Sequence, residues 1–207
     1  LRSLKRATIE WRTKMYKSNT PYISFQYKTQ DYLNLNLSTN SDEATFRVAV
    51  DIFIDRIRSR FLDQIHILAT DCDRNGFSIM ALECLLVETF AQFYDGIDDT
   101  VGVSRTKYVD FLTNNLHCFP SRTAAYRFYS DIRCGILHQA QSKPRSALTF
   151  NKTTAIDFAN SFLMVSVDRF VEEMDAYFHN YCQDLQNPSK VLLRGNFIQK
   201  MDYICHR

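Results

Sequence analysis

The sequence predicts an all-α protein: a bundle of four to five helices, preceded by an N-terminal arm that can hold short strands. Apolar residues recur at helical spacing through most of residues 41–187, and capping residues, Pro or Gly bound the stripes. Five glycines and four prolines in 207 residues argue against a β-sandwich. We expect three parts: an N-terminal helix and extended arm (1–40), a helical domain (41–187) and a C-terminal helical tail (188–207).

The composition is that of a globular domain with a substantial core. Hydrophobic residues make up 45% of the chain, and the net charge of +2 is too small to indicate nucleic-acid binding by itself. None of the six cysteines forms a CxxC pair or lies at zinc-ligand spacing from a histidine, so we expect reduced thiols, no metal site and a cytoplasmic location. The most apolar long run, 155–167, is too short to span a bilayer.

The first 40 residues change character near Pro21. Residues 1–17 carry an apolar stripe opposite a basic face, which is either the solvated side of a docking helix or an arm that contacts nucleic acid. In residues 18–40 apolar and polar residues alternate, as around Ile23 and around Leu35. We expect two short strands or extended arms here, and any strand content of the protein within this stretch.

The helical domain begins with two long helices. Ser41 is a candidate cap for the first, whose apolar stripe continues to Leu68. A turn follows at 71–76. Its sequence is similar to the start of a calcium-binding loop, but the twelfth position of such a loop would be Leu82 rather than Glu, which argues against calcium binding. The second helix spans about 77–94 and ends at Gly96. We expect its glutamates, Glu83 and Glu88, to be exposed.

Three further helices and a tail complete the pattern. The third helix runs from Ser104, and the fourth starts at Ser121 after Pro120 and contains residues 126–141. A loop covers 143–151, and a capping box at Thr154 predicts a fifth helix that ends before Pro188. That helix would be roughly 50 Å long, so part of it must pack on something else. The tail reads as a short helix interrupted by Gly195.

The fourth helix carries an Arg and a His five positions apart, Arg133 and His138. Residues at this spacing point about 140° apart on a regular helix, so they do not share a face. Gly135 and the nearby helix end can loosen the geometry, or a second copy of the chain can complete the pair. A structural pair or a contact with a partner is the alternative interpretation.

The charge around this pair favours an anionic ligand. Between residues 121 and 152 six basic side chains face one acidic one, a local net charge of +5: Arg122, Arg127, Arg133, Lys143, Arg145 and Lys152 against Asp131. Arg binds phosphate in bidentate fashion, and His can give or take a proton near neutral pH. The group therefore suits phosphodiester cleavage, with four flanking residues as candidate RNA contacts: Arg122, Arg127, Lys143 and Arg145.

The segment RCGILH (133–138) resembles the Arg-x4-6-His signature of the HEPN superfamily. FYSDIRCGILHQAQ (128–141) and the upstream helix 80–96 are also similar to segments of bacterial HEPN-like proteins. The resemblance covers roughly residues 41–187. It implies an all-α bundle of four or five helices that pairs into a homodimer. It also implies, as in many members, a metal-independent endoribonuclease without a cofactor, in which Arg133 and His138 line the cleft.

The resemblance implies a cytoplasmic RNA-cleaving enzyme that leaves a 2′,3′-cyclic phosphate, in a bacterial antiphage defence or toxin–antitoxin setting with an antitoxin or other protein partner. Catalytic members usually have a polar residue directly after the Arg, whereas this chain has Cys134. Inactive members serve as binding modules. The alternative is therefore a non-catalytic module that binds a nucleotide, RNA or protein. A third hypothesis is a purely structural helical domain.

Overall fold

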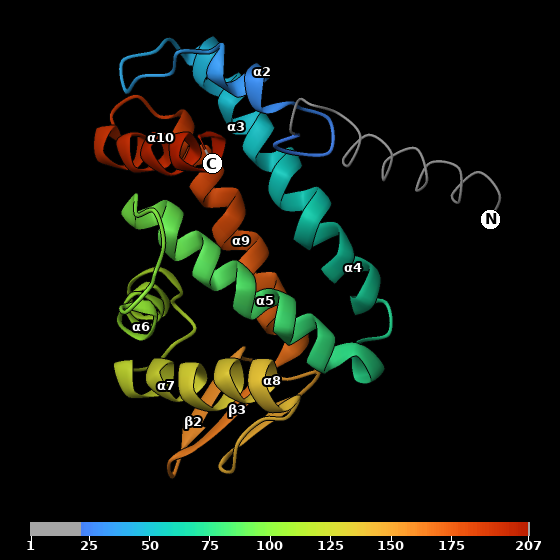
Figure 1. Ribbon diagram of the computed structural model, residues 1–207. Helices are drawn as coiled ribbons and strands as arrows, with labels where there is room; N and C mark the ends of the chain where they lie inside the picture. Colours follow the sequence, from blue (N-terminus) through green and yellow to red (C-terminus); the bar gives the residue numbers. More distant parts are fainter. Residues whose placement is uncertain (1–21, 207) are drawn as a thin grey trace, which may run out of the picture.

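The computed structural model describes residues 22–206, which are mostly helical with a small three-stranded sheet at one end (Figure 1). The predicted helix at 1–17 lies outside the described residues. The α-helices are α2 (Thr29–Leu33), α3 (Glu43–Ile57), α4 (Asp63–Ala69), α5 (Cys72–Asp95), α6 (Ser104–Asn115), α7 (Arg122–Arg127), α8 (Cys134–Gln139), α9 (Val167–Gln186) and α10 (Val191–Cys205). Two π-helical segments, η1 (Arg58–Leu62) and η2 (Phe128–Arg133), join α3 to α4 and α7 to α8.

The long helices meet around Phe53 of α3, which lies fully inside the core. Its ring centroid is 4.6 Å from that of Phe93 on α5 and 5.5 Å from that of Phe197 on α10. Two rings of α9, Phe178 and Tyr181, complete the contact at 5.8 and 5.9 Å. Aromatic pairs of this kind contribute about 0.5–1.5 kcal/mol each beyond the area they bury. One side chain therefore ties α3, α5, α9 and α10 together.

A second aromatic cluster holds the segment with the predicted site residues. Phe128, the first residue of η2, stacks on Phe170 of α9 with centroids 5.0 Å apart. It also meets Phe119 edge to face at 5.5 Å and lies 6.4 Å from Tyr108 of α6. The rod formed by α7, η2 and α8 is thus anchored to α6 and α9 at its middle.

The sheet consists of β1 (Ser146–Thr149), β2 (Ile156–Ala159) and β3 (Phe162–Ser166), in the order β1-β3-β2. The central strand β3 pairs in parallel with β1 and antiparallel with β2. Asn160 and Ser161 connect β2 to β3 with φ angles of 51° and 61°. A two-residue turn with both φ angles positive matches the twist of a hairpin, and Asn is favoured in it.

The prediction that strands lie only within 18–40 is wrong. Residues 22–40 contain one isolated bridge, between Tyr22 and Lys28, and the short helix α2, whereas all three strands lie between 146 and 166. The fifth helix begins at Val167 rather than near Thr154. Alternate residues of β3, Leu163 and Val165, are buried in the core. The same residues also fit a helical apolar stripe, but the chain follows the alternation of a strand.

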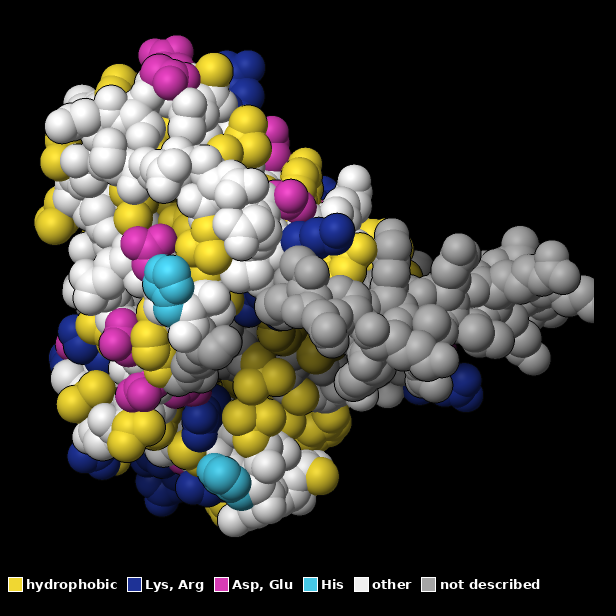
Figure 2. Space-filling view, turned by 45° about the horizontal axis from the view of Figure 1, so that its top comes forward, with side chains coloured by type: hydrophobic (Ala, Val, Ile, Leu, Met, Phe, Trp, Pro, Cys, Tyr) yellow, Lys and Arg dark blue, Asp and Glu magenta, His cyan; other side chains and the backbone are white. Residues whose placement is uncertain are grey.

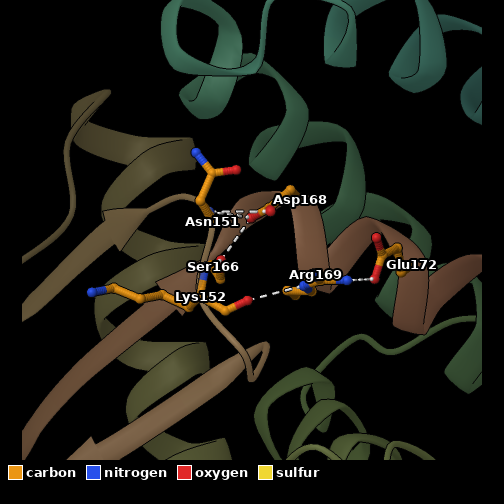
Figure 3. A network of polar contacts seen from close by, with 6 residues as sticks. All are labelled: Asn151, Lys152, Ser166, Asp168, Arg169 and Glu172. Atoms are coloured by element: carbon orange, nitrogen blue, oxygen red, sulfur yellow. Dashed lines mark hydrogen bonds and ion pairs between the residues drawn. The ribbon is translucent and has the colours of Figure 1, made fainter.

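A polar network fixes the start of α9 where the sheet ends (Figure 3). The Asp168 carboxylate accepts hydrogen bonds from the Asn151 backbone N–H at 3.1 Å and from the Ser166 hydroxyl at 2.6 Å. Arg169 donates to the Lys152 carbonyl at 3.0 Å. An acidic side chain in the first turn is also favoured by the helix dipole. These contacts tie the loop after β1 to the helix start.

Several predicted helix boundaries are confirmed, and others differ from the prediction. Gly96 ends α5 with φ of 66°, and the Ser121 side chain caps α7 by accepting the Ala124 N–H at 3.2 Å. Asp42, one residue beyond the predicted cap, caps α3. The predicted turn at 71–76 is wrong, because α5 already begins at Cys72. The tail helix α10 continues through its glycine, where a Cβ would meet nothing closer than 3.7 Å.

Among the described helices, α5 alone is long and apolar enough to cross a membrane by length and composition. The mean hydropathy of its most apolar window is 1.3, and 56% of that window is buried inside the protein. In Figure 1 α5 runs through the middle of the molecule between α4, α6 and α9. The core helix of a globular domain meets the same criteria, so this is weak evidence for a membrane span.

Candidate functional site

Arg133 and His138 lie on one rod, formed by α7, η2 and α8. Arg133 is the last residue of the π-helical segment η2, and His138 lies in the last turn of α8. A π-helical segment places one extra residue in each turn and is frequent at functional sites. The local geometry is therefore unusual directly before the predicted site Arg.

Arg133 points toward α5 and forms an ion pair with Glu88. Its Nη2 lies 2.7 Å from Oε2 of Glu88, and each side chain is only 17% exposed. The other carboxylate oxygen of Glu88 accepts hydrogen bonds from the hydroxyls of Thr100 and Ser104, the latter at 2.9 Å. The guanidinium also lies 5.4 Å from the centre of the Tyr129 ring. Glu88 is thus fully engaged and fixes the position of Arg133.

The environment keeps both members of the pair charged. Burial by itself would raise the pKa of Glu88, but hydrogen bonds from Thr100, Arg133 and Ser104 outweigh burial and lower this pKa below its usual value. Burial would likewise lower the pKa of Arg133, yet the bond to Glu88 raises it. Because neither group titrates near neutral pH, the pair is a permanent feature of the folded chain.

His138 has the opposite environment. Its side chain is exposed, and within residues 22–206 it forms no hydrogen bond or ion pair. The chain turns back directly after α8 at Ala140, which has φ of 53°. A Cβ on Gly135 would lie 2.5 Å from the Gln141 carbonyl oxygen, so only glycine fits beneath this turn. The imidazole is therefore free to contact a ligand or a second chain.

One copy of the chain does not bring Arg133 and His138 together. No hydrogen bond joins the two side chains in the described part of the protein, and they face different surroundings, Glu88 and solvent. This agrees with the 140° separation expected from their spacing. A composite site would need a second copy or a change in this segment.

Half of the basic cluster is neutralised by partners: Arg122, Arg127 and Arg133 form ion pairs, whereas Lys143, Arg145 and Lys152 form none among the described residues. Arg122 pairs with Asp110 at 2.5 Å, and Arg127 pairs with Asp131 at 3.0 Å. The two other predicted RNA contacts are Lys143 and Arg145, and neither has an ion-pair partner among the described residues. On the face drawn in Figure 2, basic and acidic side chains lie interspersed. The local charge of +5 is thus not presented to solvent as one basic surface.

Glu83 is a buried carboxyl group that the sequence did not reveal. It was expected to be exposed, but it is 0% exposed, and neither carboxylate oxygen has a hydrogen-bond partner among the described residues. Burial, and secondly the charge of Asp175, raise its pKa well above the ordinary value. Asp175 itself pairs with His66 at 2.8 Å. Because α5 is a central helix, positions beside its apolar stripe are buried as well.

Within residues 22–206 no group of three or more His, Cys, Asp or Glu side chains is arranged to hold a metal ion. All six cysteines have free thiols, and the Cys134 sulfur lies 4.0 Å from Nη1 of Arg133. The described site therefore consists of an oriented guanidinium, an exposed imidazole on the same rod and two unpaired basic side chains nearby.

No family model, no curated protein and no solved structure matches this chain. The likeness to the HEPN superfamily thus depends on the RCGILH segment and its flanks.

Proposed function

We propose that this protein is a metal-independent endoribonuclease of the HEPN type. The observation that carries the proposal is the contrast between its two motif residues: Glu88 and Tyr129 hold Arg133 in a fixed orientation, while His138 is exposed and unpaired in the described residues. A preorganised cation and a titratable imidazole are the groups that cleavage of RNA without a metal requires.

In the proposed reaction, His138 removes the proton from a ribose 2′-hydroxyl, and the resulting oxygen attacks the adjacent phosphorus. The bond from phosphorus to the 5′-oxygen of the next nucleotide breaks, and this oxygen takes a proton from water. The products carry a 2′,3′-cyclic phosphate and a 5′-hydroxyl, and His138 returns its proton to solvent. Arg133 stabilises the negative charge on the phosphoryl oxygens. Its Nη2 is bound to Glu88, but Nη1 contacts only the Cys134 sulfur and keeps N–H donors for the substrate.

The active form in this proposal is a homodimer, because within one chain Arg133 pairs with Glu88 while His138 is exposed, and no hydrogen bond joins the two. Two copies that meet along the α7–η2–α8 rod would bring both pairs to one RNA-binding cleft. Lys143 and Arg145, which have no ion-pair partner in the described residues, would contact the RNA backbone. A cytoplasmic role in bacterial defence or in a toxin–antitoxin pair follows only from the resemblance. Light scattering should detect a dimer at roughly tens of micromolar protein.

The test is an RNA cleavage assay with the wild type and His138→Ala side by side. His179→Ala is the matched control, since His179 is another exposed histidine and bonds only to Gln183 on its own helix. We expect His138→Ala to lose about 10² to 10⁴ in rate, the usual effect of removing an acid–base group, and the control to keep full activity. Wild-type cleavage by His138→Ala would reject the proposed role.

The second candidate is a non-catalytic module of the same fold that binds RNA, a nucleotide or a protein. The ion pair between Arg133 and Glu88 favours it, because a compensated guanidinium attracts phosphate less strongly. Cys134 in place of a polar residue favours it too. A wild type that binds RNA but leaves it intact, with binding weakened by Lys143→Glu, would select this candidate.

A further inference from the structure

A pocket separate from Arg133 and His138 is lined by residues of α5, α6, α9 and α10 and of the loop after α6. Its volume is about 330 Å³, enough for a small organic molecule. We call it the α9 pocket, because α9 supplies most of the side chains that matter below. Three tyrosines, two carboxylates and an amide form the relevant part of its wall: Tyr94, Tyr177, Tyr181, Glu173, Asp184 and Asn180.

The charged groups of the α9 pocket are acidic. No Lys or Arg lines it, and Glu173 has no ion-pair partner among the described residues. Asp184 forms an ion pair with Lys190 at 3.2 Å. Lys190 does not line the α9 pocket, but it lines a second pocket beside it. The nearby thiol of Cys118 responds to this environment: burial, and secondly Glu173, raise its pKa to about 12. A cation in the α9 pocket would therefore meet one carboxylate without an ion-pair partner, Glu173, beside the paired Asp184 and the imidazole of His117.

The tyrosines add a second, independent attraction for a cation. Tyr177 and Tyr181 stack with their centroids 6.0 Å apart, and Tyr94 is partly exposed. The Tyr177 hydroxyl oxygen is buried and has no hydrogen-bond partner in the described residues. Aromatic faces attract cations, and a buried oxygen without a partner is costly unless a donor reaches it. A ligand that carries N–H donors on a positive charge would satisfy both needs.

The α9 pocket lies beside a larger pocket of about 620 Å³, and both are lined by Tyr94, Asp184 and Leu193. The larger pocket is lined in part by Val191 and Leu192, both largely exposed. This apolar strip can cover the methylene groups of an alkyl chain whose charged end lies in the α9 pocket. Two ion pairs, Lys107 with Asp95 and Lys190 with Asp184, also line the larger pocket and balance each other in charge. The two pockets together fit an elongated molecule with a positive end and an aliphatic body.

We propose that the α9 pocket binds the primary ammonium group of a free aliphatic diamine or polyamine. Glu173 neutralises the ammonium, and the Tyr177 hydroxyl oxygen and the Asn180 amide oxygen accept its N–H bonds. A quaternary ammonium would lack these donors and should bind more weakly. A lysine side chain of another protein presents the same chemistry, so the experiment must separate the two sources.

The experiment is calorimetric titration of the full chain with putrescine (1,4-diaminobutane), with butane-1,4-diol as the uncharged probe of equal length. Glu173→Gln should weaken putrescine binding by tenfold or more, since a hydrogen bond to a charged group is worth about 1.5–3 kcal/mol. Glu172→Gln is the matched control: Glu172 is exposed, pairs with Arg169 and lies outside the pocket. It should leave binding within about twofold of the wild type, a free-energy change too small to reflect a lost contact.

Circular dichroism of both variants ensures that a loss of affinity is not a loss of folding. The proposal fails if putrescine does not bind at about 10 mM, if the diol binds equally well, or if both variants weaken binding alike. A blocked lysine, N-acetyl-lysine amide, is the last probe. Tighter binding of this probe than of putrescine would assign the pocket to a partner protein's lysine and overturn the free-amine assignment.

Discussion

At the scale of single residues, two glutamates on α5 illustrate how burial and partners decide the state of a carboxyl group. Glu88 is half-buried, accepts three hydrogen bonds and keeps its charge. Glu83, a little over one turn earlier, is fully buried without a partner among the described residues. An ionised carboxylate there would be uncompensated, so burial raises the pKa of Glu83 and favours its protonated form.

Glu83→Gln should make the protein less sensitive to alkaline pH. In the unfolded chain Glu83 ionises near pH 4.3, whereas its folded pKa is raised, so the folded state binds more protons between the two values. Wild-type stability therefore falls as the pH rises above about 4.3, by up to about 1.4 kcal/mol per pH unit from this residue. The measurement is urea unfolding of both proteins at pH 5 and at pH 8. The free energy of unfolding of the variant relative to the wild type should be higher at pH 8 than at pH 5.

The exposed Glu172→Gln is the control and should follow the wild type at both pH values, because Glu172 is solvated. If the free energies of unfolding of the wild type and of Glu83→Gln differed by the same amount at pH 5 and at pH 8, Glu83 would be ionised in the folded protein.

Glu88→Gln should destabilise the protein, because it leaves the Arg133 charge partly buried and unpaired. We expect a loss of about 2 to 4 kcal/mol in urea unfolding at pH 7, near the usual cost of breaking a buried ion pair. The folded pKa of Glu88 is lowered, so this stability is present above about pH 4.3 and is lost as the pH falls through the folded value. RNA cleavage should fall as well, since Glu88 orients Arg133.

Asp110→Asn removes the partner of Arg122 in an exposed pair and serves as the comparison. Its cost should stay below about 1 kcal/mol, as for most surface ion pairs. Equal losses in the two variants would contradict the view that burial makes the pair of Glu88 and Arg133 different.

At the scale of elements, the short helix α8 depends on the close return of the chain after it. Gly135→Ala would bring a methyl group within 2.5 Å of the Gln141 carbonyl and 3.2 Å of the Lys143 nitrogen, both backbone atoms. We expect a loss of about 1–3 kcal/mol by thermal or urea unfolding, despite the better helix propensity of alanine.

Gly195→Ala in α10 is the matched substitution. A Cβ at this helical position would meet only the Thr39 methyl at an ordinary 3.7 Å, so the variant should gain up to about 1 kcal/mol. A Gly135→Ala protein as stable as Gly195→Ala would show that the loop after α8 gives way easily.

Most helices could be predicted because their signals are local. Caps such as Ser121 and stops such as Gly96 act within a few residues of the helix that they bound. The hairpin of β2 and β3 was missed because its residues also fit a helical stripe, and because Asn160–Ser161 is a weaker turn signal than Asn-Gly. The pairing of β3 with β1 depends on a parallel partner about 17 residues away, which no local pattern specifies.

At the scale of the whole molecule, the helices are held by residues far apart in the sequence. The Phe53 cluster draws on four helices, and Arg133 meets Glu88 from 45 positions away. The sequence identifies such residues as apolar or charged, but not which of them meet. It could therefore indicate Arg133 and His138 as candidates, and it could not reveal that Glu88 binds one of them while the other stays exposed.

The proposed chemistry requires the ribose 2′-hydroxyl and no metal ion, so the decisive measurement compares two oligonucleotides of one sequence in EDTA. One is RNA, and the other is methylated at every 2′-oxygen. We expect the full-length chain to cleave the RNA, to leave 2′,3′-cyclic phosphate ends, and to spare the methylated strand. Cleavage of the methylated strand, or cleavage that appears only when Mg²⁺ is restored, would contradict a reaction carried by Arg133 and His138.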